Sequence, residues 1–305
     1  MSFFSHKTKL ILAFGVIYII WGSTFFGVHL GLKSFPPFLF SALRLLIAGV
    51  ALTAFCFFKR EPFPPLSEIK KHAALGLIIF IGGIVGVVWA QQYVSSSLAS
   101  AIITTPFWFI VLDRQQWKFY FSNKWIIGGL LLGLAGVLLL AAHKQGRVGS
   151  ESNEMQWLSI MVIVLGSFTW VAGSLYLKYK PSQTSVYVNT SIQLLSAGIF
   201  CAALSYFSSE WSTFSINAVR LDSILALFYL AIISSMIGFL SFMWLIKVQP
   251  PAIVSTYSYV NPLVATLLGW AFANEPITSV QLTGLAIILF GVLLVNVPRY
   301  QNLKN

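Results

Sequence analysis

Charged side chains are scarce in this sequence. Only 9% of the 305 residues are charged and just 8 are Asp or Glu, whereas 57% are hydrophobic and the mean hydropathy is +0.83. A soluble domain carries about 25% charged residues, so this composition excludes an ordinary soluble protein. A bilayer span needs roughly 20 apolar residues, and runs of that kind follow one another here. The sequence therefore predicts an all-α membrane protein embedded in a lipid bilayer.

Catalytic and cofactor motifs are also missing. The four histidines are scattered, with no H-E-x-x-H, and there is no P-loop, no Gly-rich dinucleotide fingerprint and no G-x-S-x-G elbow. The two cysteines, Cys56 and Cys201, lie in separate apolar runs, as small buried hydrophobes do. An ATP-driven pump would need a nucleotide-binding domain, which the short loops cannot supply. We expect no enzyme, no cofactor and no metal.

The net charge of +11 does not indicate a nucleic-acid partner, because the basic residues sit in short loops between apolar runs. We predict ten spans, at residues 8–31, 36–58, 73–94, 97–117, 124–142, 156–177, 183–207, 223–247, 251–273 and 278–297. With the N-terminus inside, 14 basic residues fall on inner segments and 4 on outer ones. The positive-inside rule then places both termini in the cytoplasm.

The two halves of the chain repeat one pattern. RLLIAG from Arg44 matches QLLSAG from Gln193, and Trp21 matches Trp170, both 149 residues apart. Ten spans divide into five and five, and because five is odd, the second copy enters the membrane from the opposite side. Inverted repeats are typical of alternating-access carriers. The predicted repeats, each of five helices, are residues 1–149 and 150–305.

Two of the predicted spans contain a proline in their interior. Pro106 ends the stretch ASAIITTP, and Pro262 ends STYSYVNP 156 residues later. A proline in a helix interior clashes with the carbonyl four residues back, here Ile102 or Ser258. In lipid, a freed carbonyl needs a partner in the protein or in a water-lined cavity. Paired interruptions in two halves indicate a transporter's binding site.

Longer motifs resemble the drug/metabolite transporter superfamily, EamA-like branch. They are YIIWGSTFF from Tyr18, FPP from Phe35 with RLLIAG after it, YSYVNPLVATLLGW…NEP from Tyr257, and a closing G-x6-G-V-L-L. The resemblance covers nearly the whole chain. It implies a bacterial inner-membrane carrier with ten spans that exports amino acids or related small metabolites. The family commonly has an acidic residue like Glu275 after the fourth span, whereas the first half offers only Asp113 there, without the glycine that often precedes it.

Arg44 is the one charge predicted well inside a span, about 12 Å from its outer end at 1.5 Å per residue. An intramembrane arginine costs about 2.5–3.5 kcal/mol on insertion scales, so it faces a cavity or a partner. Two interpretations stay open: a substrate or gating contact, for example to a carboxylate, or a structural tie to backbone carbonyls or to Glu275. His29 has an ordinary titration range near neutral pH, with a surface or packing role as its alternative, and proton coupling has no support in the sequence.

Candidate pathway residues are aromatic or polar side chains within spans, because aromatic walls suit metabolites with apolar parts. Core packing is the alternative for the tryptophans, and interhelical hydrogen bonding for the polar residues. The candidates are Trp21, Arg44, Trp89, Gln92, Thr105, Pro106, Trp108, Trp170, Asn189, Gln193, Tyr257, Tyr259, Asn261 and Pro262. The G-x-x-x-G pairs Gly27/Gly31 and Gly129/Gly133 mark either a homodimer face or close packing within the bundle.

These features predict a secondary transporter, an exporter of small organic metabolites such as amino acids, which works by alternating access in the bacterial inner membrane. The alternative is a passive facilitator or channel for small solutes. An ion filter would show repeated carbonyl or acidic rings, and the sequence has no such pattern.

Overall fold

The computed structural model describes residues 5–103, 105–142, 153–273 and 278–302, and every regular element within them is a helix. The first half holds α1 (His6–Gly31), α2 (Pro37–Phe58), α3 (Leu66–Gly76), η1 (Leu77–Val85), α4 (Gly86–Ala90), α5 (Ser96–Ile102), α6 (Thr105–Leu112), η2 (Arg114–Gln116), α7 (Trp117–Ser122) and α8 (Lys124–Ala142). The second half holds α9 (Asn153–Tyr179), α10 (Val186–Phe207), α11 (Glu210–Thr213), η3 (Ile216–Ala218), α12 (Leu221–Phe228), η4 (Tyr229–Gly238), α13 (Phe239–Val248), α14 (Pro251–Val254), α15 (Tyr257–Ala273) and α16 (Ser279–Asn302).

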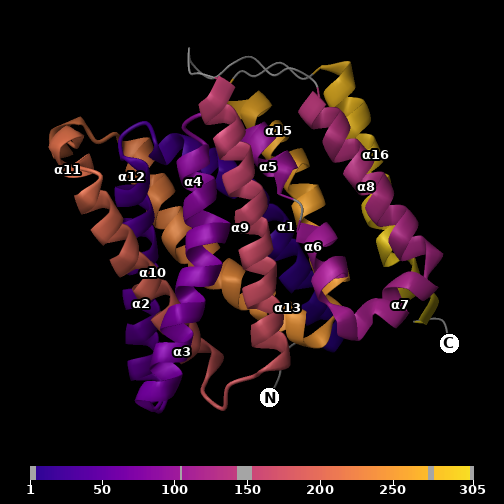
Figure 1. Ribbon diagram of the computed structural model, residues 1–305, viewed down its shortest axis with the longest axis horizontal. Helices are drawn as coiled ribbons and strands as arrows, with labels where there is room; N and C mark the ends of the chain where they lie inside the picture. Colours follow the sequence, from indigo (N-terminus) through magenta and orange to yellow (C-terminus); the bar gives the residue numbers. More distant parts are fainter. Residues whose placement is uncertain (1–4, 104, 143–152, 274–277, 303–305) are drawn as a thin grey trace.

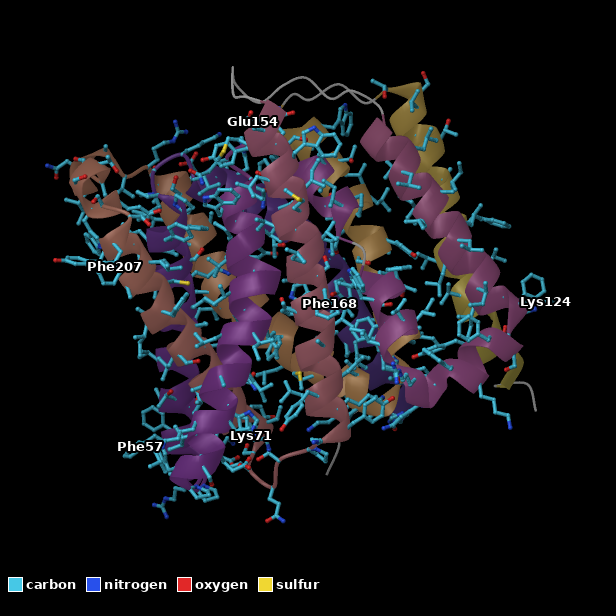
Figure 2. The ribbon with its side chains drawn as sticks, viewed as in Figure 1. Phe57, Lys71, Lys124, Glu154, Phe168 and Phe207 are labelled. Carbon is cyan, nitrogen blue, oxygen red and sulfur yellow. The ribbon has the colours of Figure 1, made fainter. Side chains whose placement is uncertain are left out.

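Six continuous helical stretches of the described residues are long and apolar enough to cross a bilayer. They are His6–Gly31, Pro37–Phe58, Leu66–Ala90, Glu154–Tyr179, Val186–Phe207 and Leu221–Val248. Each overlaps one predicted span. Of the other four predicted spans, 97–117 and 251–273 fall on broken helices, while 124–142 and 278–297 fall on α8 and α16, whose apolar stretches Lys124–Gly136 and Leu282–Val295 are shorter. The count of ten and the cytoplasmic termini therefore stay predictions. Exposed Phe57 and Phe207 point away from the bundle (Figure 2), as lipid-facing side chains do.

The third span begins at Leu66, earlier than the predicted 73. Pro65 precedes it in an extended conformation, with φ −63° and ψ 157°, and the helix runs on from there. Glu68 and His72 therefore belong to a long helix and not to a loop. This extension places two ionisable side chains on the first turns of a membrane-spanning element.

A π-helical stretch interrupts each of two matching spans. η1 lies within Leu66–Ala90, and η4 lies within Leu221–Val248. A π-helix bonds i to i+5 and widens the helix locally, and such segments occur frequently at functional sites. Nothing in the amino-acid pattern predicted either one.

Both proline-bearing segments are discontinuous. Between α5 and α6 the chain leaves the helix at Ile103, with φ −65° and ψ 102°, and Pro106 is the second residue of α6. Proline fits a helix start, where its missing N–H has no partner to lose. The expectation that Pro106 sits in a helix interior is therefore wrong. Pro262 does lie inside α15, after a break at Ser255 and Thr256.

Counterparts from the two halves pack against each other, α2 along α10 and α8 along α16 (Figure 1). A Cβ placed on Gly129 would lie 2.6 Å from the Gly291 carbonyl, and one on Gly136 would lie 2.8 Å from the Gly284 carbonyl. Gly129 and Gly136 correspond to Gly284 and Gly291 at an offset of 155, so these contacts are reciprocal. The order of the contacts makes α8 and α16 antiparallel. The glycines of the Gly129/Gly133 pair thus serve close packing within the chain.

Candidate functional site

A central cavity of about 80 Å³ lies where α1, α2, η1, η4 and the broken helices meet. One water needs about 10–15 Å³ on this measure, so the cavity holds several waters or a compact metabolite. Its wall includes six of the predicted pathway residues, all buried: Trp21, Arg44, Thr105, Trp170, Tyr257 and Asn261. The two halves therefore both contribute to one cavity.

Aromatic rings form one wall of the cavity. Trp21 meets Trp170 edge to face at 5.5 Å between ring centroids, and Tyr257 stands 4.7 Å from Trp21 in the same arrangement. Phe242 backs both indoles, at 5.2 Å and 5.5 Å. Edge-to-face pairs contribute about 0.5–1.5 kcal/mol each beyond burial. The wall is therefore a fixed surface, suited to an apolar group of a substrate.

Glycines of the π-helical stretches set the positions of these indoles. A Cβ on Gly238 would lie 2.6 Å from Trp21 Nε1, and a Cβ on Gly83 would lie 2.6 Å from Trp170 Cε3. The Trp21 indole N–H also donates to the Ser234 carbonyl at 3.4 Å. Each tryptophan thus packs on the π-helical stretch of the opposite half.

Arg44 reaches the cavity from α2 with 3% of its surface exposed. Its Nε donates to the Ser235 hydroxyl at 2.8 Å, and its Nη2 donates to the Ser234 hydroxyl at 3.2 Å. No acidic side chain of the described residues lies within ion-pair distance of it. Glu275, the acidic partner considered above, lies outside the described residues. Among the described residues the partners of Arg44 are neutral hydroxyls, and none of these residues supplies a counter-ion to the buried positive charge.

Several polar atoms at the cavity wall lack a hydrogen bond of standard geometry. They are Thr105 Oγ1, Gln91 Nε2, Trp170 Nε1 and Asn261 Oδ1. The Tyr257 hydroxyl also interacts with Thr105 and Trp170, but these contacts do not have standard hydrogen-bond geometry. Buried polar groups are normally paired, so a polar ligand or ordered waters would complete this site.

Trp89 and Gln92 line a different hollow, beside Phe35 and Glu210. Glu210 accepts from the backbone N–H groups of Phe38 and Leu39, at 3.0 Å and 2.7 Å. A carboxylate there stabilises the start of α2. This hollow therefore lies at the end of the bundle where α2 begins.

The remaining predicted residues are spread over the bundle. Asn189 and Gln193 line a small cavity beside His72. Trp108 packs edge to face on Phe168 at 5.2 Å, and the Tyr259 hydroxyl donates to the Leu130 carbonyl at 3.0 Å. Pro106 lies at the start of α6, and Pro262 lies inside α15.

Sequence reasoning missed the serines that hold Arg44. Ser234 and Ser235 stand side by side in the apolar run 229–238, and that isolated polar pair was a usable signal. Gln91 belongs to the same cavity and was passed over in favour of Gln92. Gly83 and Gly238 carry no signal of their own, since glycines in spans serve many purposes.

The bundle is tied together below the cavity, at the end where α1 begins. Asp113 is buried and accepts from the Tyr120 hydroxyl at 2.7 Å and the Tyr179 hydroxyl at 2.5 Å. Burial, reinforced by the nearby carboxylate, raises the pKa of Tyr120, so this phenol keeps its proton and donates. Tyr18 and Thr256 add a hydroxyl pair at 2.6 Å. These contacts join α6 and α7 to α9, and α1 to the break before α15.

Comparison with known proteins agrees with this architecture. The sequence model of the EamA-like transporter family matches residues 8–142 and 157–297. The uncharacterized inner membrane transporter YedA of Escherichia coli K12 is 30% identical over 299 residues, covering 97% of this chain and 94% of YedA. The uncharacterized transporter YvbV of Bacillus subtilis is 25% identical over 298 residues, covering 95% of this chain and 92% of YvbV.

A solved crystal structure shares the fold. It superposes with a TM-score of 0.74 over 97% of this chain and 99% of that chain, at 16% sequence identity. The helical bundle with apolar spans, the central cavity and the match along most of the sequence lead to one assignment. This chain belongs to the EamA-like transporter family and is a membrane transporter.

Proposed function

We propose that this transporter is a secondary carrier that exports small carboxylate-bearing metabolites, amino acids above all, across the bacterial inner membrane by alternating access. In this proposal ten spans form two inverted five-helix repeats, residues 1–149 and 150–305, with both chain ends in the cytoplasm. The carrier has no enzymatic activity and uses no nucleotide, cofactor or metal.

The observation that carries the proposal is the charge of Arg44 at the cavity wall. The serine hydroxyls occupy Nε and one N–H of Nη2, while a guanidinium has five N–H donors in a planar fork. A carboxylate matches that fork and supplies the missing negative charge. The unpaired Asn261 Oδ1 suits an ammonium group, and the aromatic wall suits an apolar side chain. Together these three features fit an amino acid.

The reciprocal packing of the halves supports alternating access. The Asp113 cluster and the Tyr18–Thr256 pair tie one end of the bundle, while the cavity lining extends toward the other end as far as Val88 and Gln91. Exchanging the conformations of two inverted repeats, which a pseudo-two-fold axis in the membrane plane relates, gives a second state in which the other end is tied.

A transport assay in proteoliposomes tests the proposal. A radiolabelled mixture of the protein amino acids should enter vesicles containing the protein, faster when unlabelled amino acids are inside. Amino acids should compete for this uptake and their carboxamides should not, because the amide lacks the charge that Arg44 binds. Uptake without stimulation by internal substrate would indicate a passive facilitator instead. No uptake of any labelled amino acid would overturn the proposal.

A further inference from the structure

A second polar cluster lies apart from the central cavity, near the end of the bundle marked by Lys71 in Figure 2. It surrounds a cavity of about 30 Å³, room for about two waters. His72 and Gln193 are each 1% exposed and Asn189 is 7% exposed. Ser182 and Thr184 line both this cavity and a wider surface hollow that contains Glu68, so solvent lies close by.

Three buried polar atoms in this cluster make no hydrogen bond: His72 Nε2, Gln193 Oε1 and Asn189 Oδ1. Gln193 Nε2 lies 3.0 Å from His72 Nδ1, on the other side of the ring. His72 Nε2 lies 3.5 Å from Glu68 Oε2, one helical turn away. Buried polar groups are normally hydrogen-bonded, so the cluster is incomplete as it stands.

A neutral His72 ring leaves part of the cluster unpaired in either tautomer. With its proton on Nε2, Nδ1 accepts from the Gln193 amide N–H, and Gln193 Oε1 has no donor. With its proton on Nδ1, the lone pair of Nε2 faces the Glu68 carboxylate, and two acceptors oppose each other. Neither tautomer resolves the arrangement.

One added proton resolves it. An imidazolium donates from both nitrogens, so Nε2–H points to Glu68, and Nδ1–H meets Gln193 Oε1 once the amide flips. The flipped amide turns its NH2 group toward Asn189 Oδ1, four residues earlier on the same face of α10. A single proton and a single flip therefore provide partners for all three unpaired atoms.

We propose that His72, with Glu68 as its counter-ion and Gln193 as its amide switch, is a proton-binding site that couples transport to the proton gradient. This inference rests on the proposed carrier function. The site joins α3 of the first half to α10 of the second, so its occupancy changes a contact between the halves.

The charges around His72 are few. Glu68 and Lys71 lie on the same helix as His72. The Glu68 carboxylate accepts hydrogen bonds from Ser182 Oγ at 2.7 Å and from Lys71 Nζ at 3.2 Å. From α13, Lys247 lines the cavity, while α10 contributes only neutral polar groups. Glu68 is the only acidic residue with a contact to His72 in the described part of the chain, so the proton depends on it.

One residue of this site corresponds, through the repeat, to a residue of the central cavity. Gln193, the partner of His72, is the counterpart of Arg44 at an offset of 149. Arg44 holds a fixed positive charge in one half. Protonation of His72 places a removable positive charge beside Gln193, the position in the second half that corresponds to Arg44.

Histidine-selective nitrogen NMR on the purified, detergent-solubilised protein tests the site without any substrate. The chain has only four histidines, and the His72 signal is the one lost in His72→Gln. Between about pH 8 and 5 its ring should pass from one bound proton to two. Glu68→Gln should move that transition to lower pH, because the counter-ion is gone, whereas His29→Gln should leave it in place. A ring with one proton throughout the range would overturn the proposal in favour of two bound waters.

Coupling is tested in proteoliposomes with labelled amino acids by two rates: uptake under a pH gradient and exchange without a gradient. The quantity compared between variants is the ratio of the first rate to the second. A general loss of activity cancels in this ratio. It should depart from one in the wild type and in His29→Gln, and return to one in His72→Gln and Glu68→Gln. Absent exchange in the wild type would refute the carrier function while the NMR result still decides the proton site. Exchange with a wild-type ratio of one would refute the coupling.

Discussion

Trp21 and Trp170 are 149 residues apart in the sequence, yet their indoles meet edge to face, with ring centroids 5.5 Å apart. Each ring also packs on a glycine in the π-helical stretch of the opposite half, Gly238 for Trp21 and Gly83 for Trp170. Each half therefore supplies the glycine on which the other half's tryptophan packs. A displacement of one half moves the supports of both rings, so the aromatic wall reports the relative position of the halves.

The glycines beneath the indoles give a first prediction. Gly83→Ala and Gly238→Ala each place a methyl group about 2.6 Å from an indole atom. Overpacking of this kind costs about 1–3 kcal/mol, so both variants should melt at lower temperature in detergent. Gly15→Ala is the matched control, because a Cβ there meets nothing within 4 Å. Equal melting temperatures for all three variants would contradict the packing argument.

Arg44 gives the second prediction. Arg44→Gln should reach the membrane at normal abundance, because Gln193 occupies the matching position in the repeat. Its transport should fall about tenfold or more, since a hydrogen bond to a charged group contributes about 1.5–3 kcal/mol. Arg44→Lys keeps the charge but loses the planar fork, so it should be partly active. Abundance and transport are measured together; normal values of both in Arg44→Gln would exclude a role in transport.

The prolines give the third prediction, and the structure separates them. Pro262→Ala restores an N–H inside α15 and should straighten that helix, so transport should slow while insertion stays normal. Pro106→Ala changes only the start of α6 and should transport at nearly the wild-type rate. Uptake rates normalised to membrane abundance decide this. Equal rates for the two variants would contradict the difference in position.

Asp113 gives the fourth prediction. Its carboxylate accepts from two phenols, and charge-assisted bonds of this kind are about twice as strong as neutral ones. Asp113→Asn should therefore loosen the end of the bundle where α1 begins. Tyr179→Phe, which removes one of the two bonds, should do so less.

Maleimide labelling measures that loosening. Phe109→Cys, introduced together with Cys56→Ser and Cys201→Ser, reports on a position that is 0% exposed. Labelling should be slow in this background, faster with Tyr179→Phe and fastest with Asp113→Asn. Unchanged labelling in both would show that Asp113 does not hold this end closed.

Topology gives the fifth prediction. Reporter fusions at Lys180 and at Asn305 should report the cytoplasm, because 14 basic residues fall on inner segments and 4 on outer ones. A fusion at Ser150, in the predicted outer loop, should report the opposite side. A cytoplasmic signal there would remove the inverted repeat.

The sequence predicted that the candidate residues lie deep within the spans, but it could not predict which cavity each of them lines. Trp21 and Trp170 lie near the middle of their spans, where the proposed inverted repeat would bring counterparts together at one level. Arg44 and Gln193 lie away from the middle, and the proposed inversion would send counterparts of that kind to opposite ends of the bundle. It accounts for the position of Gln193 beside His72 and not in the central cavity.

The sequence marks Ser234 and Ser235 as an isolated polar pair, but it could not show that they face Arg44. Ser234 and Ser235 lie in the π-helical stretch η4, whose wider turn shifts the face on which each residue lies. A helical projection at 3.6 residues per turn therefore misplaces them. Pro106 was misjudged because a proline fits both a kink and a fresh helix start, and only the backbone distinguishes the two.

The antiparallel contact between Gly129 and Gly291 has an electrical consequence. Helix α8 and its counterpart α16 run in opposite directions at close range, so their macrodipoles oppose and largely cancel. The proposed inverted repeat would extend that cancellation to every counterpart pair. A membrane voltage then exerts little net force on the helices. It acts instead on any net charge that moves across the membrane, and the energy is about 2.3 kcal/mol per elementary charge for each 100 mV. The voltage dependence of transport should therefore measure the charge of the loaded site.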